Sequence, residues 1–235
     1  MRCIINAAKK FAPDAVKEVV GDALFYAHKV THGFTIGDEP FLDPLGKAIL
    51  THALTGSRSY LEFGSGGSTV LAAKTTPIIV SVESDKSFLQ AVQDKLQQLQ
   101  LRPQLAEFIH ANIGITTRWG NPLVKWPTPE RVEHWGRYPT APWAVLQREQ
   151  IVPDTVLIDG RFRVACALES LAHLPPKSQS RILVDDYTSR PEYAPITEFG
   201  QLVGIHGRMA VFSQRPDFDA ARCREAAIAF RKDFR

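Results

Sequence analysis

One stretch of ten residues, 60–69, limits the folds open to this chain more than any other. It begins with the short apolar run Tyr60–Phe63, turns through Gly64–Gly67, and leads into Val70–Lys74, which is predicted to be helical. A strand, a glycine turn and a helix in this order present main-chain N–H groups to a nucleotide-like ligand. Glycine in such a turn leaves no Cβ between the chain and the ligand. The stretch therefore predicts an α/β fold with a binding site at this turn.

The details of the turn separate two kinds of nucleotide-binding fold. Thr69 occupies the position of the last glycine in the dinucleotide fingerprint G-x-G-x-x-G. The acid Glu62, followed by Gly64 and Gly66, instead resembles the first motif of the class I S-adenosylmethionine-dependent methyltransferases. That family usually has a further glycine where Ser68 stands in this chain. The alternative interpretation is an ordinary tight turn between a strand and a helix.

Strands and helices alternate along most of the chain, which predicts a mostly parallel sheet with helices on both faces. We expect strands at 60–63, 78–82, 105–110, 154–159 and 181–184, then 203–205 and 209–212 as a hairpin around 206–208. The resemblance covers about residues 41–213 and implies the topology. It implies an α/β, three-layer Rossmann-like sandwich, whose mostly parallel seven-stranded sheet carries an antiparallel C-terminal hairpin.

The length of 235 residues suits one α/β domain with additions. We expect an N-terminal arm at 1–40, with a short helix at 13–20 and irregular chain beyond it, followed by a methyltransferase-like domain at 41–235. His28 and His32 in the arm have the spacing of zinc ligands on a helix, but a solvated pair is the simpler interpretation.

Composition limits the partners and the location. A net charge of +3 without a dense Lys/Arg block gives no indication of a nucleic-acid partner. Neither a signal peptide nor an apolar run of about 18 residues is present, so we expect a cytoplasmic protein without a membrane partner. The 3 cysteines are too widely spaced for a metal site or a disulfide framework. The sequence leaves the oligomeric state open.

A Trp/Pro-rich insertion interrupts the alternation at 114–145. It holds all 4 tryptophans of the chain, namely Trp119, Trp126, Trp135 and Trp143. We expect a long loop here, and loops of this length are often functional lids. The tryptophans then either form a wall for a flat or anionic substrate or pin the insertion to the core.

Glu83 follows the predicted strand 78–82, 19 residues after Gly64 (83 − 64). An acid at this place can accept hydrogen bonds from a ribose diol; alternatively, it is a charge at the start of the next helix. Asn112 lies where the family contacts the adenine ring, although a turn-forming role is equally consistent with its position. The resemblance implies that S-adenosyl-L-methionine is bound by Glu62, Gly64, Ser65, Gly66, Gly67, Ser68, Glu83, Ser84, Asn112 and Ile113.

Three more acids follow predicted strands. Asp159 comes after the fourth strand, and Asp185 and Asp186 come after the fifth. This pattern resembles small-molecule O-methyltransferases that hold Mg²⁺ with an Asp after strand four and an Asp-Asn pair after strand five. The resemblance thus implies Mg²⁺ on Asp159, Asp185 and Asp186 as an optional second cofactor. In the metal-free alternative, Asp186 caps a turn and Asp159 acts as a general base or orients the ligand.

These features lead to one functional hypothesis and two alternatives. We expect S-adenosylmethionine-dependent methyl transfer to a small-molecule acceptor, on oxygen, with Asp159 as the catalytic residue. One alternative is a nicotinamide-dependent oxidoreductase, against which Thr69 argues. The other is a non-catalytic binding protein that keeps a methyltransferase fold.

Overall fold

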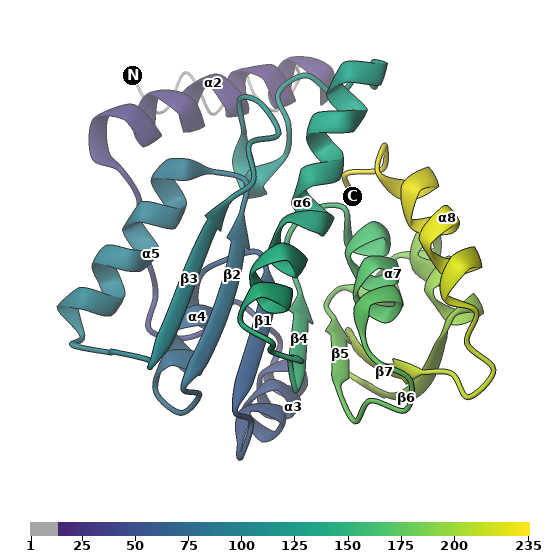
Figure 1. Cartoon of the computed structure of the whole chain (residues 1–235). Helices are drawn as coiled ribbons and strands as arrows, with labels where there is room; N and C mark the ends of the chain where they lie inside the picture. The colour runs from purple at the N-terminus through teal and green to yellow at the C-terminus, as the bar shows by residue number, and fades with distance from the viewer. Residues whose placement is uncertain (1–13) are drawn as a thin grey trace.

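The computed structural model describes residues 14–235, so Pro13, the expected start of the first helix, lies outside the described part of the chain. Seven strands form one sheet in the order β3-β2-β1-β4-β5-β7-β6 (Figure 1). The strands are β1 (Ser59–Phe63), β2 (Ile78–Glu83), β3 (Leu105–His110), β4 (Thr155–Ile158), β5 (Arg181–Val184), β6 (Gly200–His206) and β7 (Met209–Gln214). Pairing among the first five is parallel, whereas β7 runs antiparallel to both β5 and β6. The predicted sheet and its C-terminal hairpin are confirmed.

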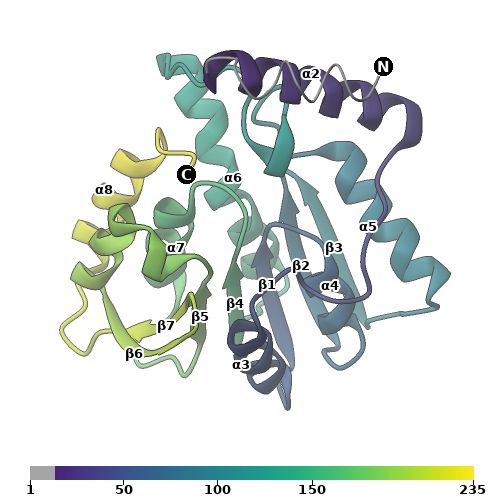
Figure 2. The same ribbon diagram turned by 180° about the vertical axis from the view of Figure 1, so that it is seen from behind.

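Helices cover both faces of this sheet, which gives three layers (Figures 1 and 2). One face carries α3 (Pro44–Leu54), α4 (Gly67–Ala73) and α5 (Lys86–Gln98), and the other α6 (Pro129–Arg148), α7 (Arg163–His173) and α8 (Ala220–Phe230). A further helix, α2 (Asp14–His32), lies across the end of the sheet where β1 to β5 finish. Short 3-10 turns occupy Arg118–Gly120, Tyr187–Ser189 and Pro191–Glu198.

The core is divided between the two faces by the alternation of side chains along each strand. Leu61 and Phe63 of β1 pack on the α6 and α7 side, whereas Tyr60 packs with Leu50 and Leu54 of α3. Every residue of β1 is buried. Burial on both faces explains why the central strands β2, β4 and β5 are largely continuous apolar runs rather than alternating ones.

Local signals set the start of α3, as the sequence predicts. Asp43 accepts a hydrogen bond from the Gly46 N–H at 2.7 Å, and Pro44 occupies the first helical position. The same carboxylate accepts a bond from the Arg208 N–H at 2.8 Å. Asp43 therefore joins the beginning of α3 to the turn of the C-terminal hairpin.

The N-terminal segment contains the expected short helix, but the helix continues through the part that was expected to be irregular. Residues 14–32 form a single helix, in which Lys17, Gly21, Phe25 and Lys29 are half-buried at every fourth position. This spacing places them on one helical face. Because that face contains only one apolar side chain, the sequence lacks the periodicity that would have revealed its full length. Its histidines, at positions 28 and 32, are exposed and their rings stack at 4.7 Å.

The insertion also differs from the expected long loop, because its second half is α6, a helix of 20 residues. Pro139 and Pro142 lie inside this helix, and proline ordinarily breaks a helix interior, which misled the prediction. Trp135 and Trp143 are buried, and Trp135 Nε1 donates a hydrogen bond to the Ile113 carbonyl at 3.1 Å. These two tryptophans attach the segment to the core, whereas the indole of Trp119 is 71% exposed.

None of the helices formed by residues 14–235 combines the length and the apolar character needed to cross a membrane.

Candidate active site

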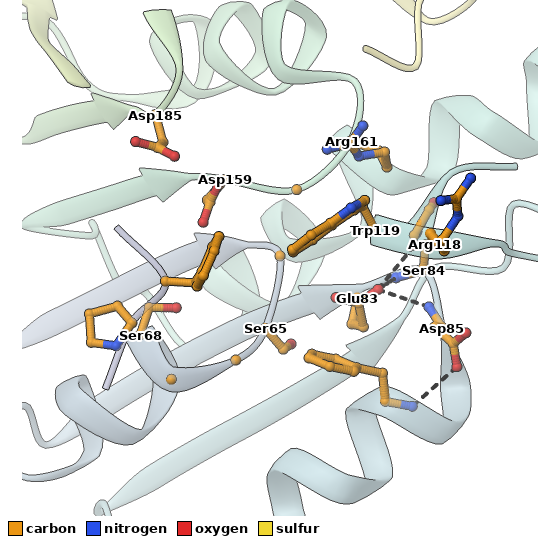
Figure 3. Close-up of a pocket in the computed structure, with 18 of the residues that line it drawn as sticks. Ser65, Ser68, Glu83, Ser84, Asp85, Arg118, Trp119, Asp159, Arg161 and Asp185 are labelled. Carbon is orange, nitrogen blue, oxygen red and sulfur yellow. Dashed lines mark hydrogen bonds between the residues drawn. The ribbon is translucent and has the colours of Figure 1, made fainter. Parts of the chain in front are cut away.

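A cavity of about 780 Å³ opens at the end of the sheet where β1, β2, β4 and β5 finish. Its walls come from the glycine turn, the end of β2, the Trp119 turn, the loops after β4 and β5, and the segment between α2 and α3. Figure 3 shows Asp159 and Glu83 on either side of Trp119, with Ser65 and Ser68 of the glycine turn nearby. In open α/β sheets this edge is where ligands bind.

The glycines of the turn differ in what a side chain at each position would meet. Gly64 has φ +102°, and a Cβ there would lie 2.7 Å from the Gly160 nitrogen. A Cβ on Gly67 would lie 2.0 Å from the Glu39 carbonyl oxygen. A Cβ on Gly66 would meet nothing within 4 Å. The turn is thus pressed against its neighbours at Gly64 and Gly67, and it leaves bare main chain at Gly66, which lines the cavity.

Glu62 lies beneath the turn and is fully buried. Its carboxylate accepts hydrogen bonds from the hydroxyls of Tyr60 at 3.0 Å, Ser68 at 2.7 Å and Ser81 at 2.7 Å, and also from Thr69. Burial raises the pKa of Glu62, while these four donors oppose that shift. Glu62 does not line the cavity. Its geometry is that of a brace for the turn, in which the Ser68 hydroxyl occupies the place of the missing glycine.

Glu83 has one oxygen engaged and one available. Its Oε1 accepts hydrogen bonds from the Ser84 N–H at 2.6 Å, the Ser84 hydroxyl at 3.0 Å and the Asp85 N–H at 2.9 Å. Within residues 14–235 no group donates to Oε2. Burial raises the pKa of this carboxyl, and the main-chain donors counteract the shift. Glu83 and Ser84 both line the cavity, so a pre-oriented carboxylate oxygen is available to a diol.

Besides Glu62, the structure separates two other expected cofactor residues, Asn112 and Ile113, from this cavity. Asn112 is exposed, accepts a hydrogen bond from the Gly114 N–H at 3.0 Å, and lines a different, shallow depression beside α2. Ile113 is buried and is not part of the cavity wall. The turn-forming role considered for Asn112 agrees with its geometry, and the expected contact with an adenine ring has no support from it.

Arginines pair with the acids after β4 and β5. Arg163 Nη2 lies 3.0 Å from Asp159 Oδ1, and Arg208 Nη2 lies 2.9 Å from Asp185 Oδ2. Asp185 is 1% exposed, whereas 30% of the Asp159 side chain is open to the cavity. Burial, followed by the charges of Asp185 and Asp186, raises the pKa of Asp159 to about 7, against the opposing effect of Arg163. Asp159 can therefore exchange a proton near neutral pH.

Asp186 has a left-handed backbone conformation with φ 59° and is surrounded by arginines. Its oxygens lie 3.2 Å from Arg208 Nε, 3.3 Å from Arg163 Nη1 and 3.5 Å from Arg190 Nη2. Together with the pairs above, each of the three carboxylates expected to hold Mg²⁺ is thus paired with a guanidinium. Residues 14–235 contain no cluster of His, Cys, Asp or Glu that could hold a metal ion. The residues present do not fit the expected magnesium site.

One part of the wall was not predicted from the sequence: the segment between α2 and α3 contributes Glu39 and Phe41. The Trp119 turn, which covers the end of β2, belongs to the stretch whose tryptophans were considered as a substrate wall. The Phe41 and Trp119 rings lie 5.7 Å apart, both largely exposed. Trp119 has φ 61° and is followed by Gly120 with φ +68°. Gly120 after Trp119, in a stretch without periodicity, is the sequence signal for this turn. The segment between α2 and α3 has no comparable signal in the sequence.

Comparison with known proteins gives one strong structural similarity. No protein-family model and no curated protein matches the chain. A methyltransferase-like protein from Silicibacter pomeroyi has a TM-score of 0.71 and 28% identity, over 84% of this chain and 100% of that one.

Weaker similarities include two further methyltransferases. The T. thermophilus 16S rRNA N2 G1207 methyltransferase, in complex with AdoMet and guanosine, has a TM-score of 0.46 and 18% identity, over 74% of this chain and 43% of that one. The Bacillus cereus O-methyltransferase, in complex with SAH, has a TM-score of 0.46 and 13% identity, over 83% of this chain and 99% of that one. At this level they carry no argument about the acceptor. The strand order and the S. pomeroyi similarity confirm the resemblance seen in the glycine turn: this chain has the class I S-adenosylmethionine-dependent methyltransferase fold.

Proposed function

We propose that this protein transfers a methyl group from S-adenosylmethionine to an oxygen atom of a small-molecule acceptor, without a metal ion. One observation carries the proposal. The bare main chain of the glycine turn, the available oxygen of Glu83 and the carboxyl of Asp159 all line the same cavity. A nucleoside, its amino-acid tail and an acceptor hydroxyl need these three kinds of partner in one place.

The binding roles follow from the geometry. Glu83 Oε2 accepts hydrogen bonds from the ribose hydroxyls, because Oε1 is held by Ser84 and Asp85. The main chain from Gly64 to Ser68 lines the methionine end, and Glu62 supports it from below through hydroxyl bonds. Since these groups are fixed before the ligand arrives, little ordering is left for binding.

Asp159 is the group that handles the proton. S-adenosylmethionine supplies an electrophilic methyl carbon on a sulfonium sulfur. Asp159 accepts the proton of the acceptor hydroxyl as the oxygen bonds to that carbon, and the electron pair of the broken C–S bond stays on sulfur. With a pKa of about 7, Asp159 is matched to a general base that works near neutral pH. The rest of the rate enhancement comes from holding acceptor and methyl group in line.

The arginines replace the expected metal in this scheme. Arg163 and Arg208 pair with Asp159 and Asp185 at N···O distances of 3.0 and 2.9 Å. They hold the carboxylates in place and offset their mutual repulsion. A hard cation would have to displace these guanidinium groups before it could reach the oxygens.

Calorimetry with S-adenosylhomocysteine tests the proposal. We expect wild type to bind it, and Glu83→Ala to bind it about tenfold or more weakly, because hydrogen bonds to a charged group contribute about 1.5–3 kcal/mol. Glu225→Ala, which changes an exposed glutamate on α8, is the matched control and should bind like wild type. Absence of binding at millimolar ligand would reject the proposal. Binding with no transfer to any of a broad panel of hydroxylated acceptors would favour a non-catalytic binding protein.

A further inference from the structure

Arg161 is a buried cation at the wall of the cavity. It lies in the loop after β4, two residues beyond Asp159, and is 8% exposed. Among the residues that the structure describes, its side chain makes one hydrogen bond, from Nη1 to Asn121 Oδ1 at 3.1 Å. The Nε atom is buried and has no acceptor. Most of the hydrogen-bonding capacity of this guanidinium therefore has no partner within residues 14–235.

The other arginines of the cavity wall differ from Arg161. Five arginines line the cavity. Four of them form ion pairs with aspartates: Arg118 with Asp22, Arg163 with Asp159, Arg190 with Asp186, and Arg208 with Asp185. Within residues 14–235, Arg161 forms no ion pair. It is thus the one cavity arginine in this part of the chain that has no carboxylate within ion-pair distance.

Keeping such a charge unpaired is costly, because a buried ion loses the hydration it has in water. Burial, and then the repulsion from Arg163, lower the pKa of Arg161. Buried cations in folded proteins are normally paired or serve a ligand. The missing partner is therefore expected to come from a molecule that enters the cavity.

The surroundings of Arg161 indicate where that molecule lies. A Cβ on Gly120 would be 3.9 Å from Arg161 Cγ and 3.6 Å from Glu83 Oε1. The Arg161 side chain therefore extends toward the Trp119 turn, on the side of the cavity where Glu83 lies, although the preceding residue, Gly160, packs against Gly64. Trp119, adjacent to Gly120, adds an exposed indole to this wall, and Figure 3 shows Arg161 close to it.

We propose that the methyl acceptor carries an anionic oxygen group, a carboxylate or a phosphate, and that Arg161 binds this group. The inference rests on the proposed function and specifies its substrate class. The acceptor hydroxyl lies at Asp159, its anionic group accepts hydrogen bonds from the Arg161 guanidinium, and a planar body between them packs against Trp119. Arg161 is then a substrate-binding residue that selects acids over their neutral analogues.

Benzoate and benzamide test this selection, because they share a flat ring and differ in charge. Their affinities are measured by ligand-observed NMR on protein saturated with S-adenosylhomocysteine. We expect wild type to bind benzoate about tenfold or more tightly than benzamide, the ratio given by a charge-assisted hydrogen bond. Arg161→Gln should bring the ratio close to one, and Arg161→Lys should restore part of it. Arg215→Gln, which removes an exposed arginine paired with Asp217, should leave the ratio unchanged.

Three results would overturn the inference. The first is equal affinity of wild type for benzoate and benzamide, a comparison that needs no variant to fold. The second is a benzoate preference that survives in Arg161→Gln. The third is that Arg161→Gln no longer binds S-adenosylhomocysteine but still binds 5′-methylthioadenosine, which lacks the amino-acid part. The anion bound by Arg161 would then be the carboxylate of the cofactor itself. If S-adenosylhomocysteine does not bind at all, the proposed function fails, and the same ratio is still measured on the ligand-free protein.

Discussion

The two halves of the cavity are built on different principles. The half at β1 and β2 consists of main chain, and its acids are held by hydroxyls and N–H groups, as Glu62 and Glu83 show. The half at β4 and β5 consists of charges, in which Asp159 and Asp185 are held by arginines. The first arrangement suits a ligand that is the same in every turnover. The second can be retuned one side chain at a time, which suits an acceptor that varies between enzymes of this fold.

The largest effect on stability should come from adding a side chain where the glycine turn of the first half packs tightly against Glu39. Gly67→Ala puts a methyl group 2.0 Å from the Glu39 carbonyl oxygen, so the segment before α3 must shift. We expect a loss of about 3 kcal/mol in the free energy of unfolding, the usual upper range for overpacking. Urea denaturation measures it. Gly66→Ala is the control, because its Cβ would meet nothing within 4 Å; equal losses for the two variants would show that the turn is not pressed against Glu39.

A smaller loss should follow from breaking the charge network of the second half. Arg208→Met leaves Asp185, which is 1% exposed, without its closest cation. We expect a loss of about 2 kcal/mol in the free energy of unfolding, below the range for fully buried pairs because the Arg208 side chain is 32% exposed. The double variant Arg208→Met, Asp185→Asn should recover part of the loss in a double-mutant cycle. Additive effects of the two substitutions would contradict this pairing.

The smallest effect concerns the protonation of Asp159 in the second half. The pKa of Asp159 is raised to about 7, so the carboxyl is mostly neutral at pH 6 and mostly charged at pH 8. A sulfonium cation is favoured by the charged form, whereas the neutral thioether of S-adenosylhomocysteine is not. The affinity for S-adenosylmethionine relative to S-adenosylhomocysteine should therefore rise severalfold between these pH values, and calorimetry at each pH measures the ratio. In Asp159→Asn the ratio should be independent of pH; a pH dependence that persists would assign it to another group.

The same difference between the halves explains what could be predicted from the sequence. The glycine turn and the acid at the end of β2 are local features, so the positions of Gly64 and Glu83 could be predicted from the strand ends, the spacing and the family resemblance; both residues line the cavity. The positions of Asp159 and Asp185 were equally predictable, because strand ends meet at one edge of a parallel sheet. Their chemistry was not, because Arg208 arrives from the C-terminal hairpin and pairs with Asp185 across 23 positions of sequence.

One helix, α2, was predicted too short and another, α6, was missed, for physical reasons that also concern the site. The half-buried face of α2 contains lysine and glycine because it packs against charged side chains rather than a core: Lys29 pairs with Asp85, and a Cβ on Gly21 would lie 3.0 Å from the Arg118 guanidinium. It therefore gives no apolar periodicity. In α6, Pro139 and Pro142 disguise a helix that tertiary packing around Trp135 stabilises. A sequence pattern reflects the secondary-structure preference of a segment by itself, whereas these two helices are stabilised by their tertiary contacts.

A crystal structure of the complex with S-adenosylhomocysteine tests most directly whether one ligand contacts both halves of the cavity. We predict that the ribose hydroxyls bind Glu83 Oε2, that the homocysteine lies along the main chain of residues 64–68, and that the sulfur faces Asp159. A ligand bound elsewhere, or a ribose that does not touch Glu83, would contradict it.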